Sequence, residues 1–97
     1  MAINWTEFQS LSKTIEDAIN QSIPQNTTDY VTYINTITVA MSNITEAETN
    51  YLNERSIVTS KQQVEKYTEA LELLNIWYTR LKNLLTNSYN TYPLVES

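Results

Sequence analysis

The chain contains no cysteine, no histidine and no glycine. Without cysteine, it can form neither a disulfide scaffold nor a thiolate metal site. Without histidine, it lacks the commonest general base, and a Ser-His-Asp triad cannot be built. Without glycine, the glycine-rich loops that cradle phosphates in nucleotide-binding proteins are excluded. We therefore expect a non-enzymatic protein that carries no cofactor and no metal.

Positive charge is also scarce. Six lysines and arginines stand against eleven aspartates and glutamates, which gives a net charge of −5. The basic residues form no run, and this argues against nucleic acid as a partner because such binding depends on clustered cations. No stretch approaches the ~20 apolar residues of a membrane span. The first residues lack the basic and apolar regions of a signal peptide, so we expect a cytoplasmic or virion-associated protein.

The segment from Lys61 to Tyr89 is the most regularly patterned part of the chain. Its apolar residues recur with alternating spacings of three and four, which is the heptad pattern of a coiled coil. They are Val64, Tyr67, Leu71, Leu74, Tyr78, Leu81 and Leu85. This pattern predicts a helix over residues 60–89.

Residues 4–22 are predicted to form the first helix. Asn4 can cap its start, and Pro24 ends it because the residue before a proline is disfavoured in a helix. The apolar residues fall on one helical face: Trp5, Phe8, Leu11, Ile15, Ala18 and Ile19. We expect this face to pack against the rest of the chain.

Residues 28–54 are predicted to form the second helix, capped by Thr27 or Thr28. Its apolar residues are again spaced by four and three: Tyr30, Ile34, Ile37, Met41 and Ile44. Because the same stretch is rich in β-branched residues, a strand over residues 30–41 is the alternative. The helix is favoured because no partner strand is evident, and a lone strand is not stable.

The apolar pattern loses its phase at residues 55–60, between the predicted second and third helices. A turn is favoured there because the stretch contains weak helix formers and because Ser60 and Gln63 form a capping box. The alternative is one continuous helix over residues 29–89, about 90 Å long by its rise per residue. Such a helix could bury its apolar seam only against another chain.

Together these segments predict an all-α fold in a single domain over residues 1–97. Its form is a three-helix up-down bundle, or a long helical hairpin with a shorter N-terminal helix. An extended tail is expected over residues 90–97 because Pro93 interrupts the last helix.

Several apolar residues fall outside the predicted core and are candidates for protein interaction. They are Leu73, Ile76 and Trp77 on the third helix, Leu52, Ile57 and Val58 near the turn, and Tyr92 and Leu94 in the tail. Around Leu73 the third helix is apolar on nearly all sides. Either the first two helices cover it completely, or its outer side meets another chain.

These features favour a non-enzymatic structural or assembly subunit that acts through helix–helix packing. Its partner would be itself, as a homo-oligomer, or another protein, and a small virion or filament component is an example. The alternative is a small acidic adaptor or inhibitor that binds one protein partner. A third hypothesis uses the carboxylates of Glu69 and Glu72 for acid–base work or cation binding, but an exposed acidic face explains them better.

Overall fold

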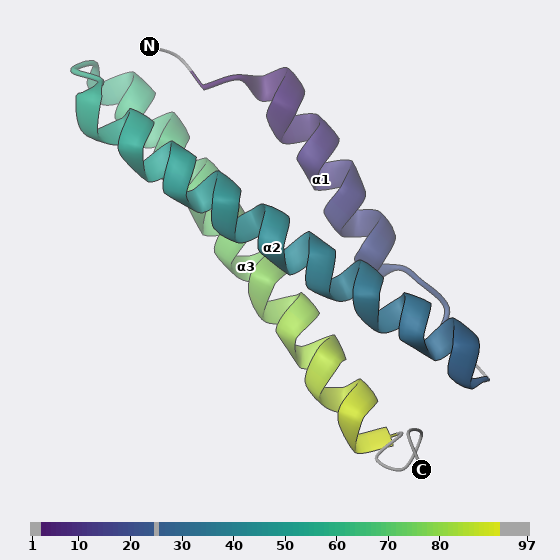
Figure 1. Cartoon of the computed structure of the whole chain (residues 1–97). Helices are drawn as coiled ribbons and strands as arrows, with labels where there is room; N and C mark the ends of the chain where they lie inside the picture. Colours follow the sequence, from purple (N-terminus) through teal and green to yellow (C-terminus); the bar gives the residue numbers. More distant parts are fainter. Residues whose placement is uncertain (1–2, 25, 92–97) are drawn as a thin grey trace.

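The computed structural model describes residues 3–24 and 26–91, and these contain three helices and no strand. The helices are α1 (Trp5–Ile19), α2 (Thr27–Ile57) and α3 (Lys61–Thr91). Helices α2 and α3 run antiparallel as a long hairpin, and the shorter α1 packs against both of them (Figure 1). The body measures 54 × 20 × 15 Å. The prediction of an all-α three-helix fold is confirmed.

The strand alternative for residues 30–41 is wrong, because this stretch lies inside α2. Its threonines use their hydroxyl donors within the helix. The Thr36 hydroxyl donates to the Thr32 carbonyl at 2.9 Å, and the Thr38 hydroxyl donates to the Ile34 carbonyl at 2.7 Å. Ile37, Ala40 and other residues of the same helical face are buried. The burial of this apolar face favours the helix and outweighs the β propensity of the individual residues.

Asparagines cap both ends of α1 and the start of α2. Asn4 accepts a hydrogen bond from the Glu7 backbone N–H at 3.2 Å, as predicted. The α1 helix stops at Ile19, three residues before the predicted end, where the Asn20 N–H donates to the Glu16 carbonyl at 2.9 Å. The expected caps of the second helix, Thr27 or Thr28, are wrong. Asn26 fills this role.

Asn26 forms a reciprocal pair with Asp29 at the start of α2. The Asp29 backbone N–H donates to Asn26 Oδ1 at 2.8 Å, and Asn26 Nδ2 donates to Asp29 Oδ2 at 2.9 Å. Asparagine is among the best N-capping residues, and here its amide satisfies both a backbone donor and a carboxylate. This pair fixes the residue at which α2 begins.

A turn between the second and third helices is confirmed, although it begins three residues later than predicted, and the single long helix is wrong. Helix α2 ends at Ile57, and residues 58–60 connect it to α3. The Ser60 hydroxyl accepts the Gln63 N–H at 3.4 Å, and the Ser60 carbonyl accepts the Val64 N–H at 3.0 Å. The hairpin therefore closes within the chain, and α3 buries its seam against α2 and α1.

The core forms along the line where the three helices meet. Its fully buried large side chains are Ile15, Ile37, Ile44, Tyr67, Leu74 and Leu81. Phe8 of α1 joins all three helices, because its ring lies 6.2 Å from that of Tyr51 on α2 and 5.8 Å from that of Trp77 on α3. This aromatic contact holds α1 in the groove of the hairpin.

Two polar contacts join α2 and α3 near the turn. The Tyr67 hydroxyl donates to Glu54 Oε1 at 2.9 Å, and Arg55 Nη1 donates to the Thr68 hydroxyl at 3.2 Å. Burial, followed by the hydrogen bond to Glu54, raises the pKa of Tyr67 from 10.0 to about 12. The phenol therefore stays protonated, and able to donate, throughout the physiological pH range.

Candidate protein-interaction surfaces

The outer side of α3 carries Leu73 and Ile76, two of the apolar residues predicted from the sequence to take part in protein interaction. Leu73 is 40% exposed and Ile76 is 50% exposed. Glu69, Leu73, Ile76 and Arg80 follow one another at spacings of four, three and four, so they share one helical face. We call these four residues the α3 ridge. Neither α1 nor α2 covers its apolar centre.

Trp77 was predicted as an interaction residue together with Leu73 and Ile76, but it does not share their exposure. It is partly buried and packs against the core, where it meets Phe8. Ala70 and Leu84, which lie seven residues before and after it, also belong to the core or pack against it. The apolar widening of the third helix on this side is therefore part of the core, and Trp77 contacts α1 there. The ridge begins beyond it.

The turn end of the hairpin carries a second exposed apolar surface. Leu52 is 46% exposed and Ile57 is 65% exposed, whereas Val58 is partly buried and packs against the core. Helix α1 begins short of this end of the hairpin (Figure 1). We call Leu52 and Ile57 the hairpin tip. The predicted tail residues Tyr92 and Leu94 lie outside the described residues.

Exposed valines on α2 were missed by the sequence reasoning. Val31 and Val39 are both exposed, in the stretch that carries no charge. Val39 also helps to line a shallow groove of about 300 Å³ beside α1, together with Thr14 and Thr36. Their position outside the three–four spacing of the second helix was the available signal.

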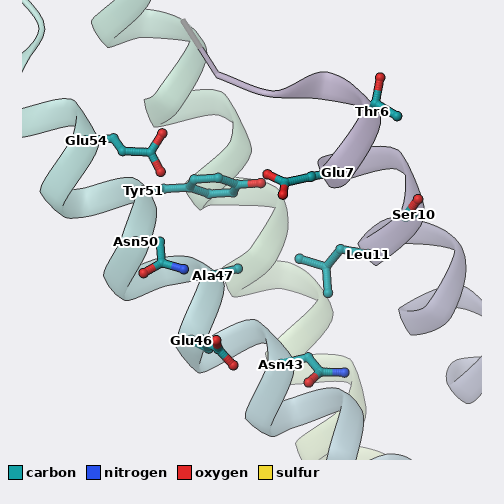
Figure 2. A pocket seen from close by; sticks show the side chains of 10 residues that line it. All are labelled: Thr6, Glu7, Ser10, Leu11, Asn43, Glu46, Ala47, Asn50, Tyr51 and Glu54. Carbon is teal, nitrogen blue, oxygen red and sulfur yellow. The ribbon is translucent and has the colours of Figure 1, made fainter. Parts of the chain in front are cut away.

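A larger groove lies between α1 and α2, with a volume of about 410 Å³ (Figure 2). Its lining residues are Thr6, Glu7, Ser10 and Leu11 from α1, and Asn43, Glu46, Ala47, Asn50, Tyr51 and Glu54 from α2. Three of these side chains are acidic, and none is basic. We call this the acidic groove. Sequence reasoning could not assemble it, because it depends on which face α1 presents to α2.

Tyr51 is one of the residues that line the acidic groove. The residue is only 6% exposed, and Figure 2 shows its phenol reaching from α2 toward Glu7 on α1. Burial raises the pKa of Tyr51, and the negative charges of Glu7 and Glu54 raise it further. The phenol therefore remains neutral and can both donate and accept a hydrogen bond.

Comparison of the chain with protein-family models, with curated proteins and with solved structures gives no match. In the described part of the chain, no group of three or more carboxylates is placed to hold a metal ion. No described helix has the length and hydropathy needed to cross a membrane.

Proposed function

We propose that this chain is a non-enzymatic structural subunit that assembles with further copies of itself through the α3 ridge. The observation that supports the proposal is the joint exposure of Leu73 and Ile76 in the middle of a helix whose other side is buried in the core. Adjacent large apolar side chains of this kind are typical of contact sites. Two ridges that meet would remove both side chains from water.

The ridge is complementary to itself in an antiparallel arrangement. Its four residues are symmetric about the point midway between Leu73 and Ile76. When two copies pair around this point, Leu73 of one lies opposite Ile76 of the other, and Glu69 lies opposite Arg80. A two-fold contact requires this kind of self-complementary patch. Apolar residues then occupy the centre, and an ion pair lies at each end.

The charged residues at the two ends of the ridge, Glu69 and Arg80, make few contacts within the protomer. Arg80 makes no hydrogen bond and no ion pair with any described residue. Glu69 Oε2 lies 3.9 Å from Lys66 Nζ, and both side chains remain about half exposed or more. Such a contact contributes little to stability. Both charges are therefore available to a second copy.

An extended assembly, such as a filament or a small virion component, needs a second and different contact, because a two-fold contact closes on itself. The hairpin tip is the candidate for it. Leu52 and Ile57 are exposed at the far end of the hairpin, and the ridge lies near the middle of α3. A subunit with two such surfaces would propagate an assembly.

The ion pairs give a direct test of the proposal. Arg80→Glu places like charges at both ends of the antiparallel contact, so we expect the dimer dissociation constant to rise about tenfold, given the strength of exposed pairs. Glu69→Arg combined with Arg80→Glu exchanges the charges, and we expect it to restore the original constant. Light scattering after gel filtration, over a range of concentrations, measures both.

A wild-type protein that stays monomeric at high concentration would overturn self-assembly. It would leave the second candidate function, an acidic adaptor that binds one protein partner. The observation in favour of that function is the all-acidic lining of the groove between α1 and α2. If the charge-exchanged variant associates as weakly as Arg80→Glu, the Glu69–Arg80 ion pairs of the antiparallel contact do not form between copies.

A further inference from the structure

The Tyr51 hydroxyl is the neutral hydrogen-bonding group that the acidic groove offers to a ligand beside its carboxylates. The Tyr51 ring packs against Phe8 at 6.2 Å and Tyr67 at 6.0 Å, so the hydroxyl end is the part that meets the groove. This hydroxyl makes no hydrogen bond to any described group of the protein. The residue is 6% exposed and its ring is held by these contacts, so the hydroxyl can bind a ligand in the groove without giving up a contact within the chain.

The acidic side chains that line the groove make few contacts within the chain. Neither Glu7 nor Glu46 has a side-chain hydrogen bond or ion pair to another described residue, and Glu54 uses one oxygen to accept from Tyr67. The groove thus offers carboxylate acceptors from two helices, with a phenol between them. The described carboxylates do not converge enough to hold a metal ion. A ligand that contacts carboxylates on both helices must carry several hydrogen-bond donors.

We propose that the acidic groove binds the guanidinium group of an arginine side chain that a partner protein presents. A guanidinium carries five N–H donors in a fixed plane and keeps its charge at any physiological pH, so it can reach carboxylates on both helices. One further donor would meet the Tyr51 oxygen. Positive charge in the ligand complements a lining that contains three carboxylates and no base.

This site is distinct from the α3 ridge and does not depend on self-assembly. The groove lies between α1 and α2, and the ridge lies on the outer side of α3. A protein with both surfaces could assemble through one and recruit an arginine-bearing partner through the other. The two proposals can therefore fail separately.

The test uses a short blocked peptide with a single central arginine and its citrulline counterpart. Citrulline keeps the shape of the side chain but replaces the charged guanidinium with a neutral urea. In a titration of the full ¹⁵N-labelled chain, we expect the arginine peptide to shift the amide resonances of Glu7, Asn50 and Tyr51, and the citrulline peptide to leave them in place. Equal shifts from both peptides, or shifts confined to other helices, would overturn the proposal.

Matched variants separate the groove from general attraction to an acidic protein. Glu7→Gln combined with Glu46→Gln should weaken arginine-peptide binding about five- to tenfold, as expected for two exposed ion pairs. Glu65→Gln combined with Glu72→Gln removes the same charge from α3 and should leave the affinity unchanged. Tyr51→Phe keeps the ring packing and should weaken binding at least about threefold, by the loss of one hydrogen bond. Equal effects from the two glutamine pairs would show charge attraction without a site.

Discussion

Leu73→Glu combined with Ile76→Glu abolishes self-association and leaves the protomer folded: this is the expected result if two copies meet through the α3 ridge. Each substitution places a carboxylate at the apolar centre of the contact, where it would lie beside other carboxylates in a water-poor environment. Both residues are at least 40% exposed in the protomer, so neither change buries a charge within the chain. We expect the dissociation constant to rise by at least a hundredfold, from the cost of about 3 kcal/mol or more for burying unpaired charge.

Sedimentation and circular dichroism together measure this outcome. The control is Thr79→Glu with Asn83→Glu, which adds the same charge to exposed positions of α3 outside the ridge's apolar centre. We expect this control to weaken association only a fewfold. Loss of helical signal in the Leu73 and Ile76 variant would instead show that these residues belong to the core of the protomer.

Phe8→Ala should cost about 3–5 kcal/mol of unfolding free energy, the typical range for removing a buried phenylalanine ring. Phe8 is 6% exposed and is the residue through which α1 contacts rings on both α2 and α3. Its loss would leave a cavity beside Tyr51 and Trp77, and α1 would lose its main hold on the hairpin. Urea unfolding followed by circular dichroism measures the change.

Val39→Ala is the matched control, because it truncates a large apolar side chain that is exposed on α2. We expect it to change the unfolding free energy by less than about 1 kcal/mol, as surface substitutions usually do. A similar loss in the two variants would mean that the aromatic contact does not hold α1 in place. Phe8→Ala should also weaken arginine binding, because α1 supplies one wall of the acidic groove.

Apolar spacing along the chain was enough to predict the fold. The heptad of the third helix contains Tyr67, Leu74 and Leu81, which are fully buried in the structure. The loss of phase before Ser60 predicted the turn, because two registers that do not join cannot share one straight seam. The exposure of Leu73 and Ile76 was consistent with their position outside that seam.

The remaining features depend on the position of α1, which sequence spacing does not determine. Trp77 and Tyr51 are covered because Phe8 lies between them, and a helical pattern gives no register between separate helices. The acidic groove has the same origin, since Glu7 and Glu54 come from helices that meet only after packing. The Asn26 cap was missed because threonine and asparagine are both good caps, and local sequence alone did not separate them.

Disulfide trapping tests the antiparallel ridge contact most directly. The chain has no cysteine, so Glu69→Cys and Arg80→Cys each introduce a single thiol. In the antiparallel dimer, residue 69 of one copy lies opposite residue 80 of the other. Two copies of residue 69 are then separated by eleven residues of helix, or about 16 Å. A disulfide requires Cα atoms within about 7 Å.

The two variants should therefore form a covalent dimer when they are mixed under mild oxidation, and neither should do so alone. The mixed dimer keeps one Glu69–Arg80 pair intact, so its association is not removed by the substitutions. Non-reducing electrophoresis with mass spectrometry of the linked peptides reads the result. Covalent dimers from either variant alone, or none from the mixture, would contradict the antiparallel contact.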